Sequence, residues 1–250
     1  MNLTLPYIVE ETGDYAVVFK PPKMHSAPLK QSEGETLFSW YASRFPSVYD
    51  LMHRLDYDTH GLVLFAKNLQ SYEFFKDLQD KGGFVKEYSA VCTRFCERFC
   101  EVPISGFPSP PVLADCAPSI GKPQVIESYF RPYGPGRKQV RPILDEENKY
   151  HEIAKDKGAM YRTEIISIKN NVITARIKRG FRHQIRCHLC LVGFPILNDP
   201  LYGSDRLYSS EPCQQPAEES DANLLALCAH ALYFTDPSTG SGQEYRIESY

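Results

Sequence analysis

Hydrophobic and polar residues alternate with two periods along the 250-residue chain, the two-residue period of strands and the 3.6-residue period of helices. Short apolar or alternating runs predict strands at residues 14–19, 62–67, 85–93, 161–168, 172–178, 224–234 and 243–247. Asn170 and Asn171 lie between two of these runs and favour a tight turn. Residues 161–178 are therefore predicted to form a β-hairpin.

Three stretches have apolar residues at helical spacing, namely residues 35–45, 68–81 and 183–192. Asn68 is suited to cap the N-terminus of the second helix, and Gly82 follows its C-terminus. Pro46 follows the first helix, and Gly193 follows the third. The ends of all three helices are thus marked by residues that favour a helix boundary.

Three other segments lack either period. Residues 103–123 are rich in proline, glycine and serine, residues 131–158 are charged and irregular, and residues 204–222 are polar and acidic. We expect the first two to be loop insertions and the third to be an exposed loop. No internal repeat and no clear linker divides the chain, so residues 1–250 are predicted to form a single domain.

Composition places the chain among ordinary globular proteins, with 42% hydrophobic and 24% charged residues. Residues 1–6 contain no basic segment followed by an apolar one, and no apolar run approaches the roughly 18 residues that cross a bilayer. We therefore expect a cytoplasmic protein without a membrane segment. No coiled-coil pattern appears, which favours a monomer.

Eight cysteines are too few for a disulfide scaffold in a chain of this length. Cys187 and Cys190 form a Cys-x-x-Cys pair, but no second pair with metal-ligand spacing accompanies it. The pair also lies within an apolar helical pattern rather than at the start of a helix, which weakens a redox interpretation. We expect reduced thiols, no metal and no cofactor.

Charge is unevenly distributed. The net charge of −3 at first argues against a nucleic-acid partner. Between residues 165 and 188, however, six basic residues occur without an acidic one: Lys169, Arg176, Lys178, Arg179, Arg182 and Arg186. Such a local positive field attracts phosphate, and the predicted helix start at residues 182–186 adds free backbone N–H groups. The alternative is a solvated basic hairpin without a ligand.

The stretch His53-Arg54-Leu55-Asp56 lies just before the predicted strand at residues 62–67. Strand ends hold side chains rigidly, so Asp56 is a candidate nucleophile or base and Arg54 a candidate substrate contact. An Arg54–Asp56 ion pair that braces a loop is the alternative, and for this segment alone it is the favoured one because short motifs often match by chance.

Several motifs that occur in a fixed order along the chain favour the catalytic interpretation of Asp56 over the ion pair. Residues 53–67 resemble His-Arg-Leu-Asp-x-x-Thr-Ser-Gly-Leu-x-x-x-Ala-Lys of the RluA-type RNA pseudouridine synthases, with His60 in place of the serine. Residues 86–88 match its Lys-x-Tyr, and residues 180–189 resemble Gly-Arg-x-His-Gln-Ile-Arg-x-His-Leu, with Phe181-Arg182 in place of Arg-x. Further matches lie at residues 19–21, 193–203 and 225–229, where Cys228 stands at a usual histidine.

The resemblance implies an α+β pseudouridine synthase fold, a mixed and largely antiparallel β-sheet flanked by helices and loops, with the active site in a central cleft. It also implies isomerisation of uridine to pseudouridine in ribosomal or transfer RNA. The N1–C1′ glycosidic bond is broken, the uracil turns, and it is rejoined through C5 without a metal or cofactor. The target nucleotide is flipped out of the RNA stack. No S4-type RNA-binding domain is expected before residue 20.

Each matched residue takes a role by the same resemblance. Asp56 corresponds to the essential carboxylate, Tyr88 to the tyrosine that packs on the uracil, and Arg186 to the arginine partner of the aspartate. Arg54 corresponds to an arginine that holds the flipped nucleotide or fills its place. The remaining RNA-binding candidates lie at the start of the third helix: Arg182, His183 and Gln184.

Two alternatives stay open. The departures at residues 60, 181 and 228 also fit an RNA-binding or assembly factor on the same fold without catalytic activity. An unrelated phosphate-processing hydrolase is disfavoured because the chain has neither a Gly-rich phosphate loop nor a set of metal-binding carboxylates.

Overall fold

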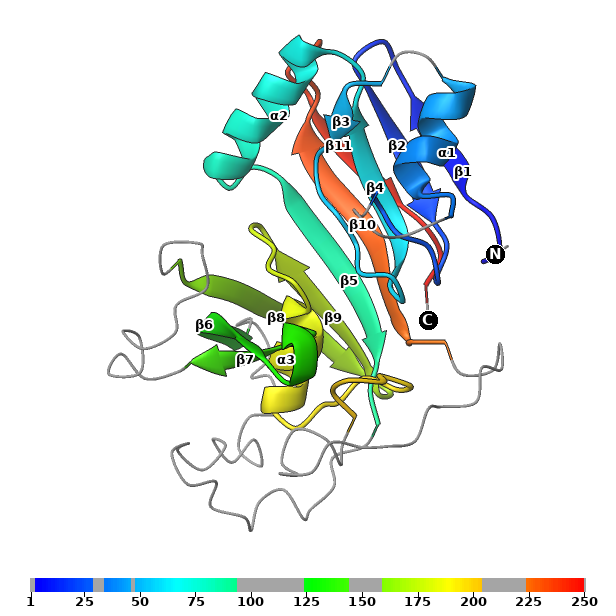
Figure 1. The fold of residues 1–250 in the computed structure, drawn as a ribbon. Coiled ribbons are helices and arrows are strands. Elements are labelled where there is room, and N and C mark those ends of the chain that lie inside the picture. Colours follow the sequence, from blue (N-terminus) through cyan, green and yellow to red (C-terminus); the bar gives the residue numbers. More distant parts are fainter. Residues whose placement is uncertain are drawn as a thin grey trace. The chain divides into compact units, whose positions relative to one another are not determined.

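The computed structural model describes residues 3–28, 34–45, 48–93, 124–143, 159–203 and 224–249 (Figure 1). The chain divides into two compact units. Unit 1 comprises Met1–Ser89 and Leu227–Tyr250, and unit 2 comprises Ala90–Ala226. The sequence contains no linker at either boundary, and a single catalytic domain remains a prediction.

Unit 1 contains a β-sheet in the strand order β1-β2-β4-β10-β5, with β3 paired to β4 and β11 paired to β10. The strands are β1 (Tyr7–Glu11), β2 (Tyr15–Lys20), β3 (Asp50–Leu51), β4 (His60–Ala66), β5 (Val85–Val91), β10 (Leu227–Thr235) and β11 (Gly242–Arg246). Strands β4 and β10 are parallel, whereas β2 pairs antiparallel with both β1 and β4. The sheet is therefore mixed and largely antiparallel, as predicted.

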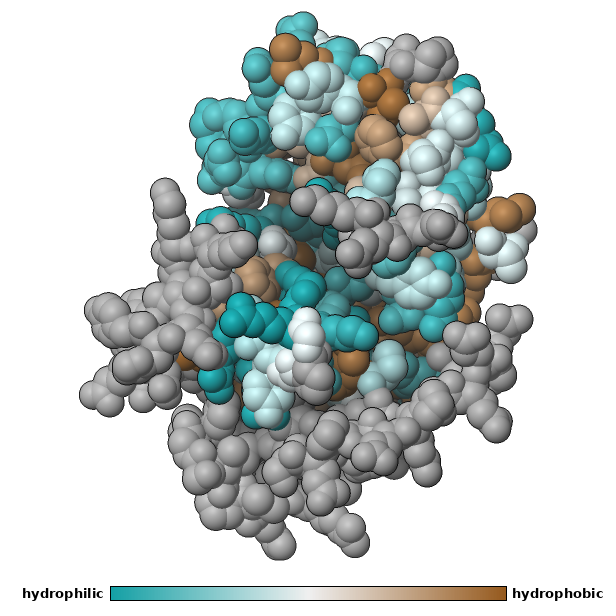
Figure 2. All heavy atoms as spheres, viewed as in Figure 1, coloured by the Kyte–Doolittle hydropathy of each residue, from teal (hydrophilic) through white to brown (hydrophobic). Residues whose placement is uncertain are grey.

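Two helices of unit 1 begin at side-chain caps. Helix α1 (Leu37–Arg44) starts at Thr36, whose hydroxyl accepts from the Ser39 N–H. Helix α2 (Leu69–Asp80) starts at Asn68, whose side chain accepts from the Ser71 N–H, so the predicted cap is confirmed. The outward face of α2 is hydrophilic in Figure 2. The exposed polar residues of this helix are Gln70, Glu73, Lys76, Asp77 and Asp80.

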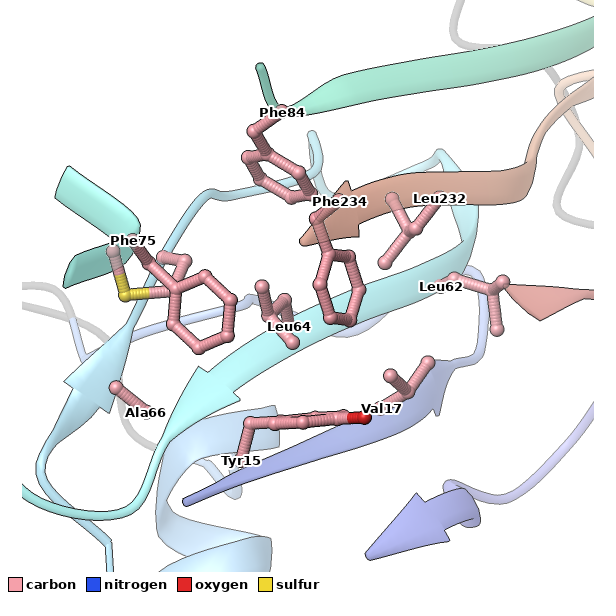
Figure 3. Packing of buried hydrophobic residues seen from close by; sticks show 10 residues of the cluster. Tyr15, Val17, Leu62, Leu64, Ala66, Phe75, Phe84, Leu232 and Phe234 are labelled. Atoms are coloured by element: carbon pink, nitrogen blue, oxygen red, sulfur yellow. The ribbon is translucent and has the colours of Figure 1, made fainter. Parts of the chain in front are cut away.

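The core of unit 1 lies between α2 and the sheet. Tyr15 packs edge-on against Phe75 of α2 and Phe234 of β10, with ring centroids 5.9 and 5.2 Å apart. Figure 3 shows these rings together with four aliphatic side chains of β2, β4 and β10, namely Val17, Leu62, Leu64 and Leu232. Every residue of β4 is buried, which makes this strand the rigid centre of the unit.

Unit 2 has strands in the order β9-β8-β6-β7, packed with one helix. Its elements are β6 (Gln124–Tyr133), the 3-10 turn η3 (Pro135–Arg137), β7 (Gln139–Ile143), β8 (Tyr161–Lys169), β9 (Val172–Ile177) and α3 (Gln184–Leu191). Asn170 and Asn171 have positive φ angles of 49° and 68° between β8 and β9. The predicted hairpin is confirmed, and its turn has the backbone that favours asparagine.

The prediction of irregular structure for residues 131–158 is wrong where the structure describes them. Residues 131–143 belong to β6, η3 and β7. Pro132 and Pro142 obscured the strand pattern, although proline is tolerated at a sheet edge such as β7. Strand β1 was also not predicted. The expected loops at residues 103–123, 144–158 and 204–222 lie outside the described residues.

Among the described residues, no helix has the length and apolar character needed to span a membrane.

Candidate active site

The predicted catalytic segment connects β3 to β4, a central strand of the sheet of unit 1. It begins after Leu51 and ends at Thr59, directly before the fully buried β4. Met52 is held at its carbonyl, which accepts from Gln79 Nε2 of α2 at 2.8 Å. The segment is thus attached both to the central strand and to the helix that covers the sheet.

Residues on both sides of Asp56 are held by the end of β2 and by the chain that follows it. Ser26 Oγ donates to the Leu55 carbonyl at 2.9 Å and accepts from the Leu55 N–H at 3.0 Å. Lys20 Nζ donates to the Tyr57 carbonyl at 3.3 Å. The Thr59 N–H closes the turn by donating to the Asp56 carbonyl at 3.1 Å. The backbone of Asp56 is therefore fixed while its side chain stays half-buried.

Lys20 contacts this turn from the end of β2, where its side chain is fully buried. Its ammonium also donates to the carbonyls of Pro21 and Met24, at 2.9 and 2.8 Å. Burial lowers the pKa of Lys20 to about 7, and the carboxylates of Asp56 and Asp58 oppose that shift. Lys20 and Asp56 thus attract each other within a largely dehydrated environment.

His53 supports the segment as a neutral side chain. Its Nε2 accepts from the Leu64 N–H at 3.3 Å, so the ring proton lies on Nδ1. Burial first, and the Lys86 ammonium second, hold the pKa of His53 well below its usual value. The ring packs on Phe84, with centroids 5.3 Å apart. These contacts agree with a structural role rather than a role in proton transfer.

The neighbours of Asp56 differ clearly in their surroundings. Asp58 forms a salt bridge of 3.0 Å with Lys23, whose side chain is half exposed. Arg54 is exposed to solvent, as expected for a side chain that contacts a substrate. Tyr57 is also exposed, and its ring packs on His25 at 4.7 Å. The carboxylates of Asp56 and Asp58 both act on buried Lys20, and Asp58 forms its salt bridge with Lys23 in addition.

Tyr88 of β5 lies close enough to Asp56 for their charges to interact. Its side chain is buried, with 6% exposed. Burial is the main cause that raises the pKa of Tyr88, and the carboxylate of Asp56 and the thiol of Cys228 raise it further. The phenol therefore stays protonated at neutral pH. Tyr88 and Asp56 are the two predicted catalytic residues that unit 1 brings together.

Unit 2 contains the third predicted catalytic residue, Arg186 of α3. Its Nε and Nη2 donate to the two carboxylate oxygens of Asp199, each at 2.8 Å. The exposed fractions of the two side chains are 2% and 0%. Such a bidentate pair fixes the plane of the guanidinium. The predicted pairing of Arg186 with Asp56 would join the two units, and it remains a prediction.

Asp199 is itself held by the turn that follows α3. Its Oδ1 accepts from the backbone N–H groups of Leu201 and Tyr202, at 2.8 and 3.0 Å. The Tyr202 ring lies 5.4 Å from the Arg186 guanidinium carbon. The motif at residues 193–203 therefore supplies both the counter-ion and the aromatic neighbour of Arg186, a function that its spacing alone did not reveal.

The residues at the start of α3 are mostly engaged within unit 2. The Gln184 amide accepts from the Phe181 N–H at 2.9 Å and donates to the Arg162 carbonyl and the Thr163 hydroxyl, each at 3.0 Å. Gln184 is buried, so it shapes the helix start rather than presenting its amide outwards. The role in RNA binding predicted for Gln184 stays a prediction.

Arg182 and His183 lie beside Gln184 and are less enclosed. Arg182 is exposed and donates to the carbonyls of Arg137 and Gln139, at 2.6 and 3.1 Å. His183 adopts a left-handed conformation with a φ of 55°, and its Nδ1 lies 3.1 Å from the Tyr202 hydroxyl. Both side chains are thus positioned by contacts with neighbouring elements of unit 2.

The cysteine pair of α3 lies in the interior. Cys187 and Cys190 are both buried, and burial raises the pKa of each thiol above its usual value. His188, between them in the helix, lies 2.8 Å from the Ser128 hydroxyl and 2.9 Å from that of Thr163. In the described part of the chain, no group of three His, Cys, Asp or Glu side chains has the arrangement of a metal site.

Comparison with known proteins decides the family. The family model described as RNA pseudouridylate synthase matches residues 14–190. The chain belongs to this family. An uncharacterized RNA pseudouridine synthase of Helicobacter pylori is 30% identical over 227 residues, which cover 91% of this chain and 67% of the relative. These matches confirm the RluA-type resemblance of the sequence motifs.

Two further comparisons agree. The tRNA pseudouridine synthase C of Haemophilus ducreyi is 24% identical over 239 residues, which cover 93% of this chain and 86% of that protein. A solved structure, human RNA pseudouridylate synthase domain containing 1, aligns with a TM-score of 0.60 at 17% identity. The alignment covers 100% of this chain and 85% of the human one. The predicted α+β pseudouridine synthase fold is confirmed, and the chain is an RNA-modifying isomerase.

Proposed function

We propose that this RNA pseudouridine synthase modifies uridine in ribosomal or transfer RNA with Asp56 as its essential catalytic carboxylate. The observation that carries the proposal is the fixed turn around Asp56. Ser26 and Lys20 hold the residues on either side of it, and the carboxylate itself is half-buried. A reacting group held in this way loses little freedom when the substrate binds.

Lys20 supports the assignment through charge. A carboxylate must be ionised to attack a sugar or base, or to remove a ribose proton, and a neighbouring cation favours the ionised form. The electrostatic attraction between Lys20 and Asp56 supplies such a cation on the protein side of the turn. Nucleophilic attack and removal of a ribose proton both need the negative charge on Asp56.

Tyr88 serves as the face on which the flipped uracil packs while it turns. An aromatic ring holds a base without fixing its rotation, because stacking is tolerant of orientation. The phenol of Tyr88 stays protonated because of burial and of the nearby carboxylate, so it presents a neutral ring. A neutral ring does not compete with Asp56 for the proton of the reaction.

Arg186 is proposed as the arginine that contacts Asp56 in the assembled active site. Its bidentate bond to Asp199 leaves the guanidinium in one orientation, which favours a directed contact. Arg54, Arg182 and His183 are proposed to contact the RNA, with Gln184 shaping the helix start beneath them. Arg54 and Arg182 are both exposed, as phosphate contacts require.

The choice between ribosomal and transfer RNA rests on the relatives. One of them is named a tRNA pseudouridine synthase, and its similarity covers 93% of this chain. Another, named ribosomal large subunit pseudouridine synthase D of Pasteurella multocida, is similar over 95% of this chain, so both kinds of RNA are substrates to test. A monomer without a cofactor in the cytoplasm is proposed with it, on the sequence grounds given above.

The proposal is tested with Asp56→Asn in an assay that measures release of tritium from 5-tritiated uridine in RNA. We expect wild-type protein to release tritium from transfer or ribosomal RNA, and Asp56→Asn to release none while it still binds RNA. Asp58→Asn is the matched control, because it removes a carboxylate two residues away that forms an ion pair with Lys23. The control should retain most of the activity.

Two results would contradict the proposal in different ways. Full activity of Asp56→Asn would overturn the role of Asp56 but not the activity. Wild-type protein that binds structured RNA and releases tritium from no cellular RNA pool would instead favour the non-catalytic RNA-binding factor.

A further inference from the structure

An exposed aromatic side chain lies directly beside the proposed catalytic carboxylate. Tyr57 follows Asp56 in the chain, so their Cα atoms are about 3.8 Å apart. Tyr57 is 43% exposed, whereas Tyr88, the other aromatic residue proposed for this site, is 6% exposed. A single exposed tyrosine is common on protein surfaces, so the neighbours of Tyr57 decide whether its ring can bind a ligand.

The ring of Tyr57 belongs to a small cluster on the surface of unit 1. The His25 ring, from the chain that follows β2, lies 4.7 Å from it between centroids and is tilted by 42°. Lys23 Nζ lies 5.9 Å from the Tyr57 ring centroid and forms the 3.0 Å salt bridge with Asp58. Two rings and one ion pair thus adjoin the turn of Asp56. We refer to His25 and Tyr57 as the aromatic pair.

The backbone of the aromatic pair is held on both sides. The His25 carbonyl accepts from the Leu37 N–H at the start of α1, at 2.9 Å. The Tyr57 carbonyl accepts from Lys20 Nζ, and the same ammonium donates to the carbonyl just before His25, at 2.8 Å. The aromatic pair is therefore attached to the group that fixes the turn of Asp56. Rings on a fixed backbone lose little freedom when a ligand binds.

The charges around the aromatic pair favour a nucleobase over a phosphate as its ligand. Lys23 already forms an ion pair with Asp58, which compensates much of its charge. Arg54, three residues before Tyr57, is exposed and supplies a cation for the RNA backbone. A neutral aromatic face next to a cation matches a nucleotide, whose base stacks on the ring while its phosphate contacts the cation.

We propose that the aromatic pair is a stacking site for an unpaired RNA base next to the target uridine. The flanking base packs on the exposed Tyr57 ring, which His25 supports, while the flipped uracil packs on Tyr88. The inference rests on the proposed function, because that function places the target uridine at Asp56. When the uridine leaves the stack, its neighbour loses a stacking partner, and the Tyr57 ring replaces part of that loss.

The first test measures Kd for unfractionated transfer RNA with Tyr57→Leu and Tyr57→Phe. Tyr57→Leu keeps an apolar side chain but removes the ring, so we expect Kd to rise by about 5-fold or more. Tyr57→Phe keeps the ring and should stay within about 2-fold of wild type. If Tyr57→Leu binds as tightly as wild type, or if wild-type protein binds no RNA, the inference is overturned.

Tyr49→Leu is the matched control. Tyr49 is 46% exposed and packs on the Tyr72 ring at 5.0 Å, so it presents the same side chain in a similar ring contact. Its N–H donates to the carbonyl of Ala66, at the end of β4 that is opposite to the catalytic turn. Tyr49→Leu should leave Kd for RNA unchanged. Equal losses in Tyr49→Leu and Tyr57→Leu would overturn the inference.

A fully paired RNA duplex separates base stacking from backbone contacts. The bases of a duplex are enclosed in the helix, so Tyr57→Leu should bind it as wild type does. The loss of affinity for transfer RNA should also be the same factor at low and high salt, because stacking releases no counterions. An equal loss on the duplex, or a smaller salt dependence in Tyr57→Leu, would make Tyr57 a backbone contact and overturn the stacking role.

Kinetics separate the stacking site from a pair of rings that only braces the turn. Stacking acts on RNA binding, so Tyr57→Leu should raise KM for tritium release with little change in kcat. A bracing role predicts the reverse, a lower kcat with an unchanged KM and a lower free energy of unfolding. Failure of the proposed function is recognised separately, because wild-type protein then releases no tritium while the Kd comparisons still decide the inference.

Discussion

The buried pair of Arg186 and Asp199 gives the sharpest stability prediction. Asp199→Asn keeps the size of the side chain but removes its charge and turns one acceptor into a donor. Two hydrogen bonds of 2.8 Å from the guanidinium depend on these acceptors, and both side chains are almost completely buried. The amide oxygen can still accept from Leu201 and Tyr202, so the loss falls on Arg186.

Removing one partner of a buried ion pair costs about 3–5 kcal/mol, because the other charge stays buried without compensation. We therefore expect Asp199→Asn to lower the free energy of unfolding by about 3–5 kcal/mol. At about 2–4 °C per kcal/mol for a chain of this size, the melting temperature should fall by roughly 6–20 °C. Tritium release at a temperature where the variant is folded should fall as well, because Arg186 loses its fixed orientation.

Urea unfolding followed by far-UV circular dichroism measures this loss. The single tryptophan, Trp40 in α1, reports on unit 1 through its fluorescence in the same titration. Glu127→Gln is the matched control, because it breaks an exposed pair with Arg162 of 3.1 Å in the same unit. That control should change the free energy of unfolding by less than about 1 kcal/mol. If Asp199→Asn lowers the free energy of unfolding by no more than this control does, the reasoning is refuted.

Two further predictions concern strand contact and pH. Gly61→Ala should lower the free energy of unfolding by about 3 kcal/mol or more, because its Cβ would overlap the Ala229 backbone. Gly13→Ala is the control and should be nearly neutral in the same urea titration, because a Cβ there meets nothing within 4 Å. Equal effects of the two variants would contradict the close approach of Gly61 to Ala229. Burial lowers the pKa of His188 to about 3, so the unfolded chain binds a proton below about pH 6.5 that the folded one does not. The free energy of unfolding should therefore fall as pH decreases from about 6.5 towards 3. Between pH 6.5 and 5, His188→Gln should lose about 2 kcal/mol less of this free energy than wild type, as measured by urea unfolding. The same pH dependence in both proteins would count against a neutral His188.

Much of the fold could be predicted because local signals agree with the tertiary structure. Asn68 caps α2 as its position indicates, and Asn170 and Asn171 form the turn between β8 and β9. Strands β6 and β7 were missed because Pro132 and Pro142 interrupt a pattern that is otherwise alternating, with Ile126 buried on one side. Pro142 lies in the edge strand β7, and Pro132 lies in the part of β6 beyond its pairing with β8, so both prolines are tolerated for a reason that the sequence does not display.

The candidate site was only partly predictable for a similar reason. The motif around Asp56 identifies the carboxylate, but it does not contain the groups that hold it in place. Ser26 lies 30 residues and Lys20 36 residues before Asp56, and they meet the turn only because β2 pairs with β4. The counter-ion of Arg186 likewise follows 13 residues later, in a turn whose spacing indicates no charge partner.

The two hydrogen bonds between Ser26 and Leu55 have a consequence for how the enzyme responds to ionic strength. They join a hydroxyl to backbone groups and involve no charge. Salt screens the attraction between exposed basic side chains and phosphate but leaves such neutral, buried bonds almost unchanged. We therefore expect added salt to weaken RNA binding while the hydrogen bonds that hold the turn around Asp56 stay in place.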